Sequence, residues 1–281
     1  MTVKIVTDST CDVPLPVANG LGMTVIPLNV HFGEEVYRDG VDISADAFYE
    51  KLVKGPVHPF TSQPSAGVFA QTYETLAKDG SEILSVHISS KLSGTYNSAV
   101  LGRQAVKTPT RIELVDSGCV SMGLGLLVIA LNEKARAGAD MERLLELTNE
   151  LLKRLETYSV ADTLEYLQKG GRVSRLRAFF GTLLKIKPVL QVTDGEVHLK
   201  ERVRSRAQGV ERLVGLVQQA GKIQDLSVMY TTSLQDAHAL AERLDPYFPK
   251  EKARIYQHGA TLGVHLGPGA LGVTFIKAGG G

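Results

Sequence analysis

The sequence predicts an α/β protein in two parts: an N-terminal α/β domain with a mainly parallel sheet and a C-terminal α+β domain with a mixed sheet. Over residues 1–158, short apolar segments alternate with longer segments of helical composition, a pattern typical of parallel sheets. Over residues 159–281 the pattern changes to a hairpin and further strands. A length of 281 residues also suits two domains.

The first domain is predicted to contain four strands and five helices. Pro27 places the second strand at a sheet edge or at the start of the strand, and Ser44 is a plausible N-cap for the first helix. The predicted strands cover Val3–Val6, Val25–Val30, Ile83–Ile88 and Arg111–Val115. The predicted helices cover Ala45–Lys54, 66 to about 78, Gly94–Val106, about 119–137 and about 140–154.

The second domain is predicted to begin with a brief strand, Tyr158–Val160, and a short helix, Leu164–Lys169. Asp194 and Gly195 separate two apolar segments and are a strong signal for a β-hairpin. The remaining predicted elements are a helix from about Ser205 to Gln219, a strand Leu226–Tyr230, a helix Leu234–Leu244 and two strands, Arg254–Tyr256 and Gly272–Ile276.

Composition narrows the class of protein. Hydrophobic residues make up 43% and charged residues 22% of the chain, which argues against disorder. The net charge is +1, so the chain lacks the field of a dedicated nucleic-acid binder. The start of the chain does not resemble a signal peptide, and the longest apolar stretch, Leu124–Leu131, is too short to span a membrane. We therefore expect a cytoplasmic protein with at most transient membrane contact.

Two hydroxyl-rich segments stand where strands give way to helices. They are Thr61–Ser65 and Ser89–Tyr96, and Gly94 in the second would let a ligand approach the backbone. Hydroxyls and free N–H groups at a helix start bind anions, and open α/β sheets bind ligands at such junctions. Each segment alone is better explained as a plain N-cap. Together they favour a site for an anionic headgroup.

Histidine and arginine residues give a weaker signal. His265 is bracketed by glycines and lies among apolar residues, a pattern more typical of a core histidine than of a ligand. Arg172 and Arg204 belong to basic clusters that suit a phosphate or an acidic protein surface. A solvated face explains these arginines about as well.

Catalytic motifs and metal-ligand motifs are absent from the sequence. It contains no P-loop, no GxSxG and no HExxH. Asp8 follows a strand as a nucleophilic aspartate would, but Thr10 stands where a second acid would be expected. Cys11 and Cys119 are the only cysteines, too few for a Cys-rich zinc site. We therefore expect neither a metal ion nor a cofactor.

Taken together, these segments resemble the DegV family of bacterial fatty-acid-binding proteins, the carrier subunits of the fatty acid kinase system. The matching segments cover nearly the whole chain: Val6–Thr10, Thr61–Pro64, Ser89–Tyr96, Val115–Ser117, Gly170–Ser174, Leu184–Leu190 and His265–Gly272. Each segment is modest alone, but their order and spacing are highly specific.

The resemblance implies a long-chain fatty acid such as palmitate, bound in a tunnel between the two domains. It implies that Thr61 or Ser62, Ser93 with the Gly94 backbone, and His265 hold the carboxylate. It also implies that Arg172 and Arg204 lie near the mouth of the site, where a partner kinase phosphorylates the bound acid before a downstream acyltransferase uses it. The protein would then be a carrier and not an enzyme.

Two other interpretations stay open at this point. The protein could be a phosphotransferase or hydrolase that uses Asp8 or Asp116 together with the arginines. It could also be a regulatory module that binds another lipid or small acid. The lack of a P-loop or a base-paired nucleophile favours a binding protein over an enzyme.

Overall fold

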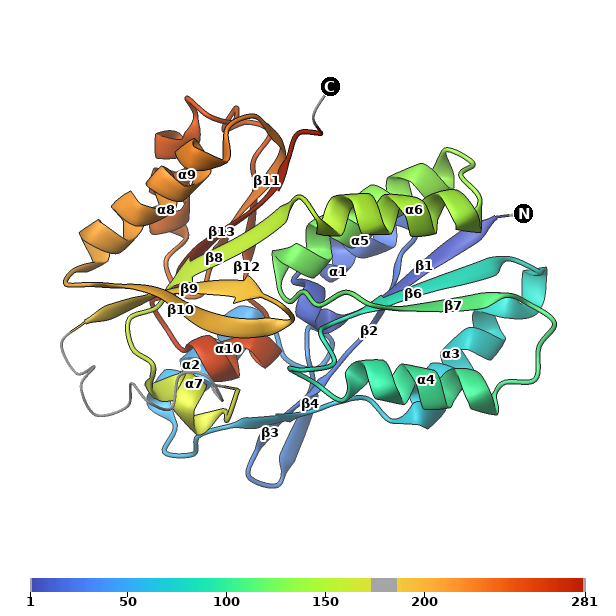
Figure 1. The fold of residues 1–281 in the computed structure, drawn as a ribbon. Coiled ribbons are helices and arrows are strands. Elements are labelled where there is room, and N and C mark those ends of the chain that lie inside the picture. Colours follow the sequence, from blue (N-terminus) through green and yellow to red (C-terminus); the bar gives the residue numbers. More distant parts are fainter. Residues whose placement is uncertain (1, 173–185, 280–281) are drawn as a thin grey trace.

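The computed structural model describes residues 2–172 and 186–279, and their strands form three sheets (Figure 1). Parts of the segments Gly170–Ser174 and Leu184–Leu190, which contribute to the family resemblance, lie outside the described residues. The prediction of a mainly parallel N-terminal sheet followed by a mixed sheet is confirmed.

The first sheet has the order β2-β1-β6-β7, with all strands parallel. Its strands are β1 (Val3–Asp8), β2 (Thr24–Ile26), β6 (Glu82–His87) and β7 (Ile112–Asp116). Alternate side chains of β1 pack in opposite directions: Ile5 faces the helices α1, α5 and α6, whereas Val6 faces α3 and α4. These helices are α1 (Leu15–Leu21), α3 (Ala66–Leu76), α4 (Thr95–Ala105), α5 (Met122–Arg136) and α6 (Met141–Leu152). This part of the chain also contains two short 3-10 helices, η1 (Ser9–Cys11) and η2 (Ala77–Asp79).

The second sheet has the order β10-β9-β8-β13-β11-β12 and is antiparallel except for the β11–β12 pair. Its strands are β8 (Leu155–Val160), β9 (Lys187–Thr193), β10 (Glu196–Val203), β11 (Ile223–Tyr230), β12 (Arg254–Gln257) and β13 (Leu271–Lys277). Helices α8 (Arg206–Ala220) and α9 (Leu234–Leu244) cover one face. On the other face, Met229 and Ile276 pack with α5, so this helix lies between the two large sheets.

The third sheet is small and antiparallel, with the order β4-β3-β5. It contains β3 (Asn29–Phe32), β4 (Glu35–Arg38) and β5 (Phe60–Ser62), and it is flanked by α2 (Ala45–Lys54) and by α10 (Ala260–Leu266), which lies next to α7 (Glu165–Lys169). Phe48 of α2 and Val264 of α10 share one buried cluster with Val30. The two halves of the chain are therefore interlaced here. The predicted boundary between residues 158 and 159 falls inside β8 and stays a prediction.

One predicted strand was wrong and one predicted turn is present. The segment Val25–Val30 is not a single strand, because Pro27 lacks an N–H donor and the chain passes there from β2 to β3 in another sheet. The predicted hairpin joins β9 and β10, with φ of +52° at Asp194 and +74° at Gly195. Both values are positive, as the two central residues of a type I′ turn require.

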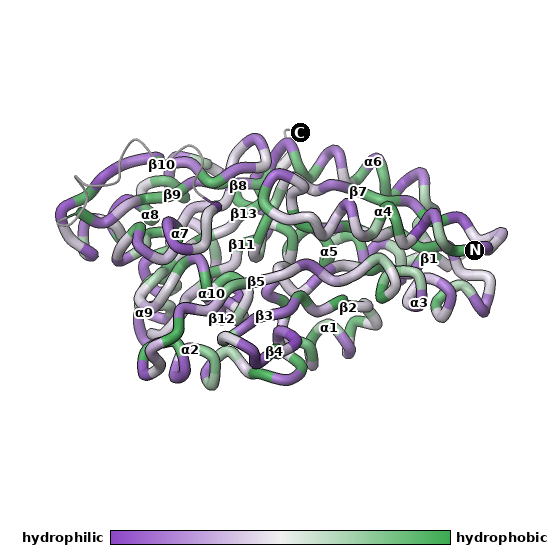
Figure 2. Tube along the Cα trace, turned by 90° about the horizontal axis from the view of Figure 1, so that it is seen from below, coloured by the Kyte–Doolittle hydropathy of each residue, from purple (hydrophilic) through white to green (hydrophobic). Residues whose placement is uncertain are grey.

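Hydropathy follows this layering. In Figure 2 the hydrophobic parts of the trace gather on the strands of the large sheets and around α5, whereas the peripheral turns are hydrophilic. Leu124, Leu126 and Leu127 of α5 are fully buried. None of the helices within the described residues is long and apolar enough to cross a bilayer.

Candidate functional site

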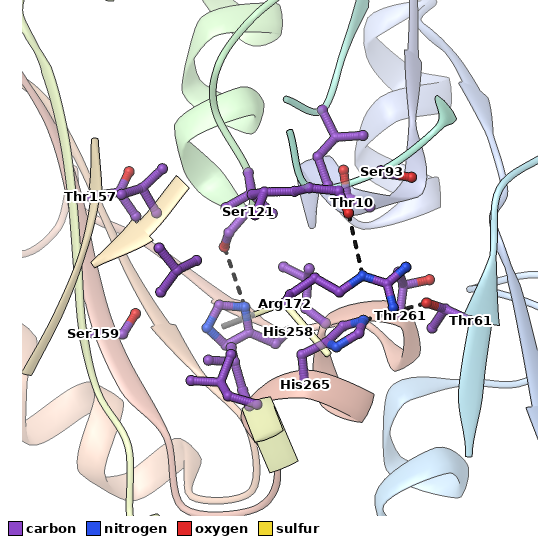
Figure 3. A pocket seen from close by; sticks show the side chains of 18 of the residues that line it. Thr10, Thr61, Ser93, Ser121, Thr157, Ser159, Arg172, His258, Thr261 and His265 are labelled. Atoms are coloured by element: carbon purple, nitrogen blue, oxygen red, sulfur yellow. Dashed lines mark hydrogen bonds between the residues drawn. The ribbon is translucent and has the colours of Figure 1, made fainter. Parts of the chain in front are cut away.

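A cavity lies where the two large sheets and α10 meet (Figure 3). Both halves of the chain supply its walls, half of which are aliphatic, and no described residue in its lining is a carboxylate. The lining residues are Thr10, Leu28, Thr61, Ile88, Leu92, Ser93, Val120, Ser121, Thr157, Ser159, Leu167, Arg172, Leu190, Val192, Val197, His258, Thr261, Leu262, His265 and Leu266. An apolar wall with a few polar groups is typical of a ligand site.

Thr61, Ser93 and His265, predicted from three separate segments, line this one cavity. Thr61 lies in β5, where it pairs with Val30, and its Oγ1 is 3.4 Å from Nε2 of His265 in α10. The Ser93 hydroxyl stands in the turn before α4, within 2.8 Å of the Thr95 hydroxyl. Figure 3 shows Thr61, His265 and the Arg172 side chain close together on one side of the cavity. Hydroxyls and an imidazole therefore converge there.

The electrostatics of His265 favour a neutral ring. Burial, followed by the nearby charges of Arg172 and His58, lowers the pKa of His265 to about 3. Its Nδ1 is buried and has no hydrogen-bond partner in the described part of the chain. Gly170 packs against this ring, because a Cβ there would lie 2.1 Å from Nδ1. The ring is thus held in place with hydrogen-bonding capacity to spare.

Arg172 adds a positive charge to the same cavity. Its Nη1 donates to the Gly170 carbonyl at 2.7 Å, and its Nε donates to the Leu92 carbonyl at 3.4 Å. The second contact links the end of α7 to the turn that carries Ser93. A carboxylate in this position would meet hydroxyls, an imidazole and a guanidinium, the donors that satisfy a buried anion.

The other predicted site residues, Ser62, Gly94 and Arg204, do not line the cavity. Ser62 follows Thr61 in a strand, and its Oγ contacts Nε2 of His31 at 2.8 Å instead of lining the cavity. Gly94 caps α4 and sits under Gln63, whose Nε2 would be 2.9 Å from an added Cβ. Arg204 is exposed at the end of β10 and is not among the lining residues.

The sequence did not single out several polar residues that line the cavity: Thr10, Ser121, Thr157, Ser159, His258 and Thr261. Thr10 follows the first strand, a signal that could have been used. Thr157 and Ser159 stand two apart in β8 and so share a face. No sequence signal relates either of them to His258, which is distant along the chain.

The two aspartates considered as nucleophiles are engaged elsewhere. Asp8 is fully buried, and its carboxylate accepts hydrogen bonds from the Thr10 N–H and hydroxyl, from the Ile88 N–H and from Nδ1 of His87. Asp116 is exposed and accepts from the backbone of the turns beside it. Neither lines the cavity, and the described residues contain no cluster of potential metal ligands.

Fold and cavity together define an α/β protein with an internal site whose lining is half aliphatic and half polar. The chain belongs to the DegV family: the model of this family, described as an uncharacterised protein family, matches residues 2–278. A DegV domain-containing protein of Streptomyces coelicolor is 35% identical, with 96% of this chain and 97% of that protein covered. Protein DegV of Bacillus subtilis is 32% identical, with 97% and 98% covered.

Solved structures agree with this assignment. A DegV family protein from Thermus thermophilus, described as fatty acid binding, superposes with a TM-score of 0.91 at 33% identity, over 99% of this chain and all of that one. DegV of Bacillus subtilis, described as a fatty acid binding protein, gives 0.89 at 30% identity over 99% and 100%. A stearic acid-binding protein from Eubacterium ventriosum gives 0.89 at 25% identity over 98% of each chain.

Proposed function

We propose that this protein binds a long-chain fatty acid such as palmitate in the cavity and holds its carboxylate with Thr61, Ser93 and His265. One observation carries the proposal: hydroxyl and imidazole groups from β5, the turn before α4, and α10 line a single cavity in which half of the lining residues are aliphatic. Relatives of the same fold are described as fatty acid binding proteins, which supports the choice of ligand.

The acyl chain would lie along the aliphatic walls. Leu190, Val192 and Val197 from the β9–β10 hairpin line the cavity together with Ile88, Leu92 and Val120 from the first half of the chain. Each methylene transferred from water to such a surface contributes roughly 0.8 kcal/mol. The acyl chain of the ligand therefore supplies most of the binding free energy, and the polar groups of the protein fix which end of the acid lies next to Arg172.

We further propose that the protein is a carrier whose bound acid is phosphorylated by a separate kinase and passed to an acyltransferase. The neutral ring of His265 supports this, because it would leave the carboxylate less firmly held than a second cation would. Arg172 could steady the phosphoryl group, whereas the exposed Arg204 would meet the kinase. The Asp8 carboxylate already accepts four hydrogen bonds from within the protein, which disfavours a role as the nucleophile of a phosphotransferase.

The proposal is tested in two measurements on the purified protein. Mass spectrometry after denaturation should release a long-chain acid, and a nucleotide or sugar acid in its place would overturn the assignment. Calorimetric titration of delipidated protein with palmitate should show binding that Ser93→Ala weakens about tenfold to a hundredfold, the value of a hydrogen bond to a charged group. Ser62→Ala is the matched control, because the Ser62 hydroxyl contacts His31 and not the cavity.

A further inference from the structure

The cavity contains a second polar group, the imidazole of His258, that the carboxylate site does not use. His258 precedes α10 and is 1% exposed. Its Nδ1 lies 2.7 Å from Oδ2 of Asp12, and the same oxygen accepts from the Ser121 hydroxyl at 2.7 Å. The other oxygen, Oδ1, accepts from the Gly259 N–H at 2.9 Å. This arrangement holds the ring firmly at one position in the cavity wall.

The partner of Nδ1 determines what Nε2 can do. A carboxylate only accepts hydrogen bonds, so Nδ1 carries the hydrogen, and a ring with that single hydrogen offers a lone pair at Nε2. Nε2 is buried and has no hydrogen-bond partner within the described ranges. In Figure 3 this edge of the ring is turned toward the side of the cavity where Ser159 of β8 lies. An unpaired acceptor thus borders the space proposed for the acyl chain.

A plain hydrocarbon chain would leave that acceptor unpaired. Burying a polar group against methylenes without a hydrogen bond is unfavourable. The contact with Asp12 explains why Nδ1 is buried, but it gives no reason for Nε2 to face an apolar ligand. Thr261, the second residue of α10, lines the same cavity.

We propose that the cavity selects a long-chain fatty acid that carries a hydroxyl group along its chain. The hydroxyl would donate to Nε2 of His258 and accept from the Ser159 hydroxyl. A ketone or ether oxygen would gain nothing at His258, because it can only accept and Nε2 has no hydrogen to give. This inference rests on the proposed fatty acid function and adds a preferred substrate class to it.

The test measures the affinity of delipidated protein for stearic acid, for hydroxystearic acids whose hydroxyl stands at successive carbons, and for the ketostearic acid of each position. For at least one hydroxyl position, His258→Leu should lower the ratio of hydroxystearic acid affinity to stearic acid affinity by about tenfold. The corresponding ratio for the ketostearic acid should not fall. Ser159→Ala should lower the same hydroxyl ratio by about threefold. The structure gives the Ser159 hydroxyl no partner in the described part of the chain, so this variant leaves no protein group unpaired.

Four results decide the matter. An equal ratio of hydroxystearic to stearic acid in wild type and His258→Leu at every position overturns the proposal. If His258→Leu does not fold, an unchanged ratio in Ser159→Ala overturns it. Ser93→Ala should weaken stearic and hydroxystearic acids alike, which separates the carboxylate site from the chain site. Failure of wild type to bind any of these acids would overturn the fatty acid function itself.

Discussion

Two histidines, one from each half of the chain, have contrasting surroundings. His87, at the end of β6, is fully buried, and both its ring nitrogens are paired: Nδ1 with Asp8 at 2.9 Å and Nε2 with the Ser85 hydroxyl at 2.7 Å. Ser85 in turn contacts the Tyr73 hydroxyl at 2.9 Å. His265 has a 3.4 Å contact with Thr61, and its Nδ1 has no hydrogen-bond partner among residues 2–172 and 186–279.

The difference separates polar groups that hold the fold from polar groups that await a ligand. Every member of the His87 network finds a partner inside the protein, as a buried structural network must. The cavity group at His265 leaves hydrogen-bonding capacity open in a place lined by aliphatic side chains. Substitutions in the first region should therefore cost stability, and substitutions in the second should cost affinity.

The largest effect is expected at Asp8. Asp8→Ala leaves His87 and three further donors without their acceptor, so the free energy of unfolding should fall by roughly 3–5 kcal/mol, the usual cost of removing one partner from a buried charged contact. Chemical denaturation measures it. Asp116→Ala, an exposed aspartate, is the control and should change the free energy of unfolding by less than about 1 kcal/mol. Equal losses in both variants would contradict a structural role for the Asp8 network.

Gly170→Ala should have the same effect on binding as the loss of the His265 side chain, although His265 itself is not replaced. The added Cβ would lie 2.1 Å from Nδ1, so the ring must move out of place. We expect palmitate affinity to fall about tenfold in Gly170→Ala, as in His265→Gln, measured by calorimetric titration. Gly215→Ala in α8 is the matched control, since its nearest atom would be 3.7 Å away. Unchanged affinity in Gly170→Ala would place the carboxylate away from His265.

Acid should destabilise the ligand-free protein partly through His265. The pKa of His265 is about 3 in the folded protein, whereas an ordinary, solvated histidine has a pKa of 6.5. Between these two pH values the unfolded chain therefore binds a proton that the folded chain does not. Stability from this group is therefore complete above pH 6.5 and is lost as pH falls toward 3. The melting temperature of His265→Gln should fall less than that of wild type between pH 7 and pH 4. Parallel curves would show that His265 titrates normally.

The smallest effect on binding is expected at Arg204. Because this side chain is exposed and lies outside the cavity lining, Arg204→Ala should leave palmitate affinity within about twofold of wild type. Acyl-phosphate formation with a cognate kinase should fall, most strongly at low salt, as expected for a rim charge. Arg172→Ala should weaken both binding and phosphorylation. A matching loss of affinity in Arg204→Ala would make it part of the carboxylate site.

The hydroxyl-rich junctions in the sequence pointed to Thr61 and Ser93, whereas His265 was assigned to the site only through the family resemblance, because its own pattern is more typical of a core histidine. Motif order and the family resemblance then linked these segments, and the comparisons confirmed the family. The contact between Asp12 and His258 could not be predicted, because it depends on how α10 packs beside η1 and not on any local pattern. Ser62 illustrates the same limit: a strand places neighbours on opposite faces, but only the pairing of β5 shows which neighbour faces inward.

The interlacing around α10 has a consequence for attempts to divide the molecule. Helix α2 belongs to the first half of the chain, yet Phe48 and Tyr49 pack on α10, and the Tyr49 hydroxyl donates to the His258 carbonyl at 3.2 Å. A gene cut after residue 158 would give two fragments, each exposing an apolar surface that the other normally covers. Co-expressed, they should assemble into one complex. A reporter split at this point would therefore be brought together by the protein's own hydrophobic core.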